Sequence, residues 1–352
     1  MYLVDCSNCR TPLQLPPGAT SIRCAICHAV TPIAVAADPR SLPLAPPPWP
    51  PAAPPPYYGA PPPPPVAGRK KAVICGISYR HTRYELQGCI NDAKCMKYLL
   101  INRFNFPESE ILMLNEEEND PYRIPTGQNI RMAMAWLVAG CQPGDSLVFH
   151  FSGHGSQQRN YTGEEADGYD ETLCPLDFET NGMIVDDEIN DTIVRPLPPG
   201  VRLHAIIDAC HSGTALDLPF LCRMNSSGQY VWEDHRPRSG RWKGTSGGEA
   251  ISFSGCDDHQ TSADTSALSK VTSTGAMTFC FIQAIEQGQA STYGSMLNAM
   301  RAAIRNTGGG GGGGVTTLLN MLVTGGSGGG LKQEPQLTAN EAFDVYAKPF
   351  IL

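Results

Sequence analysis

The chain has 352 residues and a formal net charge of −8, which argues against a generic nucleic-acid binder. Its length allows one large domain, alone or with a small module. No apolar run approaches the roughly 20 residues that a membrane-spanning helix needs. The first residues, MYLVDCSNCR, lack the pattern of a signal peptide, so we expect a cytosolic location, with the nucleus left open. In the cytosol, the 13 cysteines would be reduced thiols or metal ligands.

Two Cys-x2-Cys pairs open the chain. Cys6 pairs with Cys9 and Cys24 with Cys27, and 14 residues separate the two pairs. Four thiolates at such spacing are typical of a tetrahedral zinc site, and a segment of about 30 residues needs a metal to fold. We therefore predict a zinc finger with four cysteine ligands over residues 1–35. Because few basic side chains accompany it, we expect the finger to bind regulatory proteins rather than DNA.

A proline-rich segment follows over residues 36–69. Fifteen prolines fall between positions 39 and 66, with Trp49, Tyr57 and Tyr58 among them. Such a chain favours polyproline II and cannot build a core. The sequence predicts a semi-stiff linker, and a ligand for aromatic-lined grooves is the alternative.

Residues 70–352 alternate short apolar runs with longer segments that have helical character. This alternation predicts an α/β fold, with a mostly parallel sheet covered by helices on both faces. Asn91 or Asp92 is expected to cap the first helix, which runs to about Arg103. The other expected helices span 125–138, 276–287 and 293–305. Strands are expected at 71–77, 111–114, 146–152, 202–208 and 250–254, with a last one at 318–323 or 342–346.

Two of these strands end in reactive residues. SLVFHFSGHG places His154 just beyond one strand, and RLHAIIDACHSG places Cys210 just beyond another. In an open α/β sheet, ligands bind at the carboxyl ends of the strands. If the two strands are neighbours, an imidazole faces a thiol and generates the nucleophilic thiolate. His211 is the rival base, but as the immediate neighbour of Cys210 it would point away in an extended chain.

These motifs, His154-Gly155 and Asp208-Ala209-Cys210-His211-Ser212-Gly213, resemble those of the metacaspases, the caspase-like cysteine peptidases of family C14. The His precedes the Cys by 56 positions (210 − 154), close to the roughly 50 of caspases. Around the four N-terminal cysteines, Arg10, Leu13, Gly18-Ala19 and Ile22-Arg23 resemble the plant lesion-simulating-disease zinc finger, which narrows the resemblance to plant type I metacaspases. It implies a caspase-like α/β/α sandwich and a cysteine endopeptidase linked to regulated cell death or stress responses.

By this resemblance, the specificity pocket is lined by Cys89, Asp92, Ser152 and Asp208. Two carboxylates in a small cleft require a cation, so we expect cleavage after Arg or Lys. Simple helix capping is the alternative for Asp92. The backbone N–H groups of Gly155 and Cys210 are the candidate oxyanion donors.

The acidic run from Glu164 to Asp191 contains eleven Asp and Glu and no Lys or Arg. The resemblance implies calcium ligands at Asp170, Asp186, Asp187 and Asp217, and clustered carboxylates suit this ion. A solvated acidic hairpin around Asn181-Gly182 is the alternative. We expect calcium to order the cleft.

A polar segment between the Cys210 strand and the next strand, residues 223–249, is expected to be a processing loop. It would divide a large-subunit-like part, 70–222, from a small-subunit-like part, 250–352. The alternative for this segment is an ordinary charged loop. The alternative for the whole protein is a scaffold that acts through the zinc finger and the proline-rich segment, with peptidase activity secondary. The self-cleavage candidates are its basic residues: Arg223, Arg236, Arg238, Arg241 and Lys243.

Overall fold

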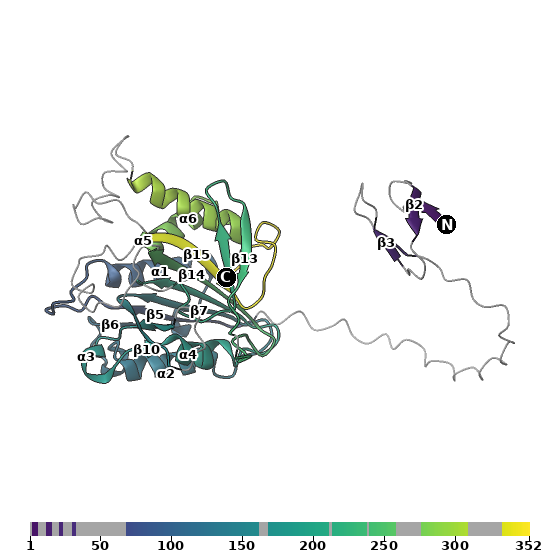
Figure 1. Cartoon of the computed structure of the whole chain (residues 1–352). Coiled ribbons are helices and arrows are strands. Elements are labelled where there is room, and N and C mark those ends of the chain that lie inside the picture. The colour runs from purple at the N-terminus through teal and green to yellow at the C-terminus, as the bar shows by residue number, and fades with distance from the viewer. Residues whose placement is uncertain are drawn as a thin grey trace, which may run out of the picture. The chain divides into compact units, whose positions relative to one another are not determined.

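The structure is a computed structural model that describes ten segments of the chain and divides it into two compact units, Met1–Pro62 and Pro63–Leu352 (Figure 1). No helix among the described residues is long and apolar enough to cross a membrane. The described segments are 2–5, 12–15, 21–23, 30–32, 68–161, 168–210, 213–237, 239–257, 276–308 and 333–352.

The first unit contains two separate antiparallel strand pairs. Strand β1 (Tyr2–Asp5) pairs with β2 (Pro12–Leu15), and β3 (Ser21–Arg23) pairs with β4 (Val30–Pro32). Along the sequence, each Cys-x2-Cys motif falls between the two strands of one pair. The four predicted zinc ligands themselves, Cys6, Cys9, Cys24 and Cys27, lie outside the described residues, as does the proline-rich segment.

The second unit is built on an eight-stranded sheet in the order β13-β12-β15-β14-β11-β7-β5-β6. The strands from β14 to β6 run parallel to one another, as expected from the sequence, and the remaining strands add antiparallel pairs at one side. The bounds are β5 (Lys70–Gly76), β6 (Ile111–Asn115), β7 (Ser146–Ser152), β11 (Arg202–Asp208), β12 (Phe220–Met224), β13 (Tyr230–Asp234), β14 (Glu249–Asp257) and β15 (Gln333–Ala339).

Helices cover both faces of this sheet (Figure 1). Helices α1 (Cys89–Phe104), α5 (Ala276–Glu286) and α6 (Tyr293–Gly308) pack on one face. Helix α2 (Gly127–Val138), the single turn α4 (Asp186–Ile189) and the π-helical turn η3 (Asn190–Val194) pack on the other. Shorter elements connect them: η1 (Glu108–Glu110), η2 (Pro121–Arg123), β8 (Gly155–Arg159), β9 (Tyr169–Leu173), α3 (Phe178–Asn181) and β10 (Ile184–Val185).

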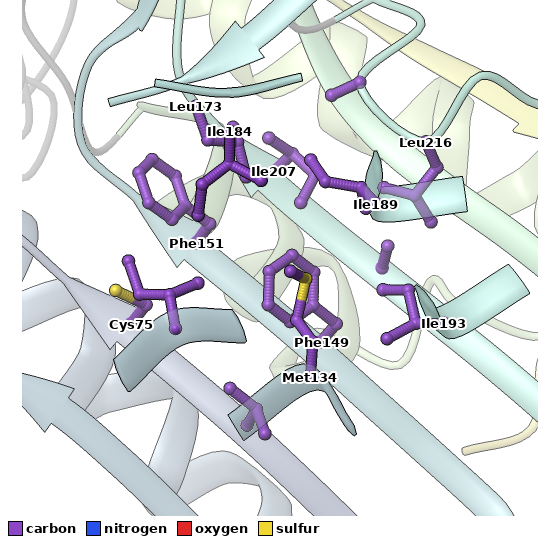
Figure 2. Packing of buried hydrophobic residues seen from close by; sticks show 14 of the residues in the cluster. Cys75, Met134, Phe149, Phe151, Leu173, Ile184, Ile189, Ile193, Ile207 and Leu216 are labelled. Atoms are coloured by element: carbon purple, nitrogen blue, oxygen red, sulfur yellow. The ribbon is translucent and has the colours of Figure 1, made fainter. Parts of the chain in front are cut away.

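Strand β7 shows how the two layers are made. Alternate side chains of a strand point to opposite faces, and every residue of β7 is buried. In the cluster on the α2 face, Phe149 lies beside Met134 and Ile193, and Phe151 lies beside Leu173 and Ile184, as Figure 2 shows. Val148 belongs to the other cluster, on the α1 and α5 face. The continuous apolar run that predicted a strand buried on both sides is therefore confirmed.

The last strand was predicted at the wrong place. Residues 342–346 form no strand, residues 318–323 lie outside the described segments, and β15 occupies Gln333–Ala339 instead. This segment contains Pro335, which discourages a strand assignment because proline cannot donate to a ladder. On the β12 side, only Leu337–Ala339 of β15 are paired. Pro335 lies outside this ladder, so β12 loses no hydrogen bond through the missing N–H of the proline.

Two further expectations need correction. Helix α1 begins at Cys89 after Gly88, so Asn91 and Asp92 lie inside its first turn and do not cap it. Residues 223–249 are not a continuous loop, because β12 and β13 form a hairpin within them. Strand β13, Tyr230–Asp234, lies at the edge of the sheet, and its residues Tyr230, Val231 and Trp232 are of the aromatic and β-branched types that favour a strand.

Candidate active site

Strands β7 and β11 are parallel neighbours, with Ser152 opposite Asp208. The chain continues for two residues beyond each of these positions, to His154 and to Cys210. The N–H of Gly153 donates to the carbonyl oxygen of Asp208 at 3.2 Å, so the two chain ends stay together beyond the ladder. The two strand ends that lead to His154 and Cys210 are therefore neighbours at this edge of the sheet.

Gly155 lies tightly against the backbone of Cys210. A Cβ placed on Gly155 would come within 2.0 Å of the Cys210 carbonyl oxygen, a distance that no side chain tolerates. Glycine is therefore required for this close approach of the two strand ends. The two backbone segments proposed to supply oxyanion donors are thus side by side.

Two hydrogen bonds hold His154, one through its ring and one through its backbone. Its Nε2 lies 2.9 Å from the carbonyl oxygen of Tyr84. Because a carbonyl only accepts, Nε2 carries the proton in the neutral ring, and Nδ1 is the basic nitrogen. Its backbone N–H donates to the Tyr79 hydroxyl at 2.9 Å, which in turn donates to the carbonyl of Cys174 at 2.6 Å. Sequence reasoning missed both tyrosines, because Tyr84 acts through its backbone carbonyl, which leaves no motif, and only the fold brings the Tyr79 hydroxyl to His154.

Burial sets the charge of this imidazole. His154 is 3% exposed, and burial lowers its pKa, an effect that the hydrogen bond to Tyr84 partly opposes. The ring is therefore neutral at pH 7 and able to accept a proton. The rival base, His211, lies outside the described residues.

Two carboxylates lie on the α1 and α5 face of the same strand ends. The Ser152 hydroxyl donates to Oδ2 of Asp92 at 3.0 Å, and the Thr278 N–H of α5 donates to Oδ2 of Asp208 at 2.7 Å. Asp92 is 9% exposed and Asp208 is 1% exposed. Burial, and secondly the charge of Asp208, raise the pKa of Asp92 to about 8.

At pH 7 the carboxylates of Asp92 and Asp208 therefore carry less than two full negative charges. Asp92 lies in the first turn of α1, so it does not cap that helix, and its side chain instead accepts a hydrogen bond from Ser152. Cys89, at the start of the same helix, is fully buried, and its carbonyl oxygen packs where a Cβ on Gly76 would lie. The four predicted pocket residues thus come from three elements that meet at one end of the sheet.

Three of the four predicted calcium ligands, Asp186, Asp187 and Asp217, are linked by their charges and ion pairs. Asp186 is fully buried, and burial, then the charges of Asp217 and Glu171, raise its pKa to about 10. These carboxylates and Asp187 therefore form one acidic cluster, in which sequence reasoning missed Glu171. Asp170 instead accepts from Asn160 at 2.5 Å and lies 3.5 Å from Gln158.

The acidic cluster connects to the catalytic strand ends. Glu171 lies on β9, which pairs with β8, the strand that starts at Gly155. Thr214, four residues beyond Cys210, donates to Oε2 of Glu171 at 2.7 Å. A change in this cluster would therefore reach the residues beside both His154 and Cys210.

The cluster contains oxygen donors of the kind that calcium prefers, and it already holds a cation. The amino group of Lys243 lies 2.5 Å from Asp217 and 3.6 Å from Asp187. Within the segments that the structure describes, no three His, Cys, Asp or Glu side chains are grouped closely enough to hold a metal as they stand. The donor chemistry thus fits calcium, while the present spacing fits an ammonium.

The self-cleavage candidates lie in different surroundings. Arg223 is part of β12 and is ion-paired with Glu233 at 3.1 Å, so its backbone is engaged in a sheet. Arg236 lies just after the hairpin and pairs with Asp234 at 2.5 Å. Arg238 lies outside the described residues. Arg241 pairs with Asp187 and Asp191, and Lys243 with the acidic cluster.

Comparisons with known proteins agree with this geometry. A model described as "Metacaspase, peptidase C14 domain" matches residues 70–219, and one for the LSD1 zinc finger matches residues 6–30. Metacaspase-1 of Arabidopsis thaliana is 74% identical over 99% of this chain and 96% of its own length. Metacaspase-2 of the same plant is 55% identical over the full length of both chains. Metacaspase-1 of Eremothecium gossypii is 41% identical over 68% of this chain and 62% of its own.

Proposed function

Because this chain belongs to the metacaspase family of caspase-like cysteine peptidases, we propose that it is a calcium-activated endopeptidase that cleaves after Arg or Lys. His154 and Cys210 carry the reaction, Asp92 and Asp208 bind the basic side chain, and Cys89 and Ser152 complete the pocket. The observation that carries this proposal is the register of β7 against β11, with Ser152 opposite Asp208. It supports the proposal because the strand ends that lead to His154 and Cys210 lie next to each other at one end of the sheet.

The chemistry follows from the tautomer of His154. With Nε2–H directed at the Tyr84 carbonyl, the basic nitrogen Nδ1 takes the proton of the Cys210 thiol. The thiolate sulfur attacks the substrate carbonyl, and the N–H groups of Gly155 and Cys210 stabilise the oxyanion. The imidazolium then donates its proton to the leaving amine, which leaves a thioacyl-enzyme. His154 next activates a water that hydrolyses the thioester and returns the proton to sulfur.

The pocket predicts an unusual pH dependence. With a pKa of about 8, Asp92 is mostly neutral at pH 7 in the free enzyme, whereas an arginine side chain binds its ionised form. We expect kcat/KM for an Arg peptide to rise about tenfold between pH 7 and pH 9, because one proton leaves Asp92. The His154 pKa is lowered, so this base does not titrate in that range.

Asp92→Asn is expected to remove this dependence, while the pH dependence of Cys210 alkylation by iodoacetamide stays as in the wild type. The alkylation rate reports the thiol independently of substrate binding. A rise of kcat/KM that persists in Asp92→Asn would assign the ionisation to another group.

Calcium is proposed to act at the acidic cluster. Asp186, Asp187 and Asp217 would hold the ion, Glu171 would join them, and Asp170 stays a candidate at the neighbouring position. Bound calcium would supply the positive charge that orders the acidic segment and the Asp217 loop. Through Thr214 and β8, this ordering reaches the loops that carry Cys210 and His154.

Chelation of calcium is expected to lower peptidase activity at least about tenfold, and Asp186→Asn with Asp187→Asn to make the enzyme insensitive to added calcium. The measurement is the hydrolysis of a fluorogenic Arg peptide at controlled free calcium. Glu108→Gln is the control, because Glu108 is an exposed carboxylate outside the acidic segment and pairs with Lys97. Full activity in the chelated wild type would exclude calcium activation.

Self-processing is proposed in the segment between β13 and β14. Among the basic candidates, Arg241 and Lys243 lie outside any strand or helix, whereas Arg223 is part of a sheet. A peptidase needs an extended segment that it can accommodate in its cleft, so we expect cleavage between residues 235 and 248 and not at Arg223. Calcium-treated wild type and Cys210→Ala are compared by intact-mass spectrometry. Fragments that also form in Cys210→Ala would point to another protease.

The N-terminal part supports a regulatory role beside catalysis. The LSD1 zinc-finger match over residues 6–30 favours structural zinc on Cys6, Cys9, Cys24 and Cys27, and a protein-binding surface. A scaffold that acts through this module, with peptidase activity secondary, is the second candidate function. Regulated cell death or stress responses in the cytosol or nucleus are the proposed setting, on the strength of the family resemblance alone.

A further inference from the structure

A buried lysine occupies the acidic cluster. The Lys243 side chain is only 4% exposed, and its Nζ lies 2.5 Å from Oδ2 of Asp217 and 3.6 Å from Oδ1 of Asp187. Lysine is rarely buried unless it is paired, because removing its charge from water is costly. Here, the carboxylates of two separate chain segments compensate that charge. Lys243 therefore occupies the place that a small inorganic cation would take.

Further contacts hold residues 239–248, the segment that contains Lys243, against the acidic cluster. Arg241 pairs with Asp187 at 3.0 Å and with Asp191 at 3.1 Å. The side-chain amide of Asn190 donates to the carbonyl oxygens of Lys243, at 2.9 Å, and of Asp217, at 3.2 Å. Two cationic side chains and one amide thus hold this segment against the acidic cluster and the Asp217 loop.

We propose that Lys243 is an internal cation that calcium displaces, and that its release frees residues 239–248 from the acidic cluster. This inference rests on the calcium part of the proposed function and adds the event that calcium triggers. A divalent ion with six to eight oxygen ligands engages the carboxylates of several segments at once, which one ammonium with three donors cannot do. Once these carboxylates bind calcium, Arg241 and Lys243 lose the ion pairs that hold them.

The displaced segment has the chemistry of a substrate. Its two basic side chains are of the kind that the Asp92 and Asp208 pocket is proposed to accept. We call the arrangement in the structure, with residues 239–248 held on the acidic cluster, the latched form. In it, the side chains of Arg241 and Lys243 are held by ion pairs and that of Lys243 is buried, so neither is available to the substrate cleft. Latch release would therefore make calcium binding a precondition of self-cleavage, without a separate activator.

The test measures calcium affinity in the full-length Cys210→Ala protein, which cannot cleave itself. If the latched form outnumbers the open form about ten to one, removing the ammonium tightens the apparent affinity about tenfold. Isothermal titration calorimetry should therefore show about tenfold tighter calcium binding in Cys210→Ala with Lys243→Met. Lys348→Met is the matched control, because Lys348 pairs with Glu249 at the opposite end of the strands, and its affinity should equal that of Cys210→Ala.

A second measurement does not depend on the folding of the Lys243→Met variant. Amide hydrogen exchange of residues 239–248 in Cys210→Ala should become faster when calcium is added, because the segment leaves the cluster. Calcium binding with unchanged or slower exchange there would overturn the latch and leave calcium activation standing. So would unaltered or weaker affinity in a folded Lys243→Met. Absence of calcium binding to Cys210→Ala would overturn both.

Discussion

Replacing Cys210 by Ala should reduce kcat for an Arg peptide by at least about 10⁴-fold, because removal of the nucleophile leaves only binding and oxyanion stabilisation. His154→Gln should lose a comparable factor, since a glutamine amide cannot accept the proton of the thiol. The double variant should be no worse than either single one, as expected for two groups that act as a unit. The measurement is kcat under saturating substrate with calcium present.

Folding controls make this result interpretable. Cys210 is partly exposed and follows β11, so its substitution removes little packing and should leave the thermal midpoint almost unchanged. Cys174, a buried cysteine next to the same strand ends, gives a matched control as Cys174→Ala, which should keep the catalytic thiol. Activity retained in a folded Cys210→Ala would place the nucleophile elsewhere.

Replacing Asp208 by Asn should lower kcat/KM for Arg and Lys peptides by roughly 100-fold, about 3 kcal/mol, because a buried charge partner of the substrate is lost. The asparagine oxygen still accepts from the Thr278 N–H, so the backbone around α5 need not move. Asp92→Asn should have a smaller effect at pH 7, where that carboxyl is already mostly protonated, and a larger one at pH 9.

The loss of kcat/KM in Asp208→Asn should be confined to peptides with Arg or Lys before the cleaved bond. Glu108→Gln, which removes an exposed carboxylate paired with Lys97, should leave the kinetics unchanged. A peptide that ends in Asp should stay a poor substrate of the wild type. Equal losses for basic and neutral peptides would show that Asp208 supports the fold rather than the specificity.

Much of this site could be predicted because its parts lie at strand ends. Apolar runs that stop at Ser152 and Asp208 locate the edge of the sheet, and the residues after them are the reactive ones. A parallel register then requires only that the two strands be neighbours, which the structure confirms. Local patterns thus located His154 and Cys210 without any knowledge of the helices.

Other features depend on tertiary contacts that no local pattern carries. Tyr84 acts through its backbone carbonyl, which every residue possesses. Asp92 looks like a helix cap in the sequence, but its partner is Ser152 on a distant strand. The ion pair of Lys243 with Asp217 joins the segment before β14 to the loop after Cys210, so only the folded chain shows that a basic segment occupies the acidic cluster.

Covalent labelling tests directly whether Cys210 is the nucleophile and whether the pocket accepts a basic residue. Wild-type enzyme with calcium is treated with two peptide chloromethyl ketones that differ only in the last residue, Arg or Asp, and the modified residue is identified by mass spectrometry. We expect the Arg reagent alone to alkylate Cys210, and this labelling to be lost in His154→Gln and strongly slowed in Asp208→Asn. Labelling of another cysteine, or preference for the Asp reagent, would contradict this expectation.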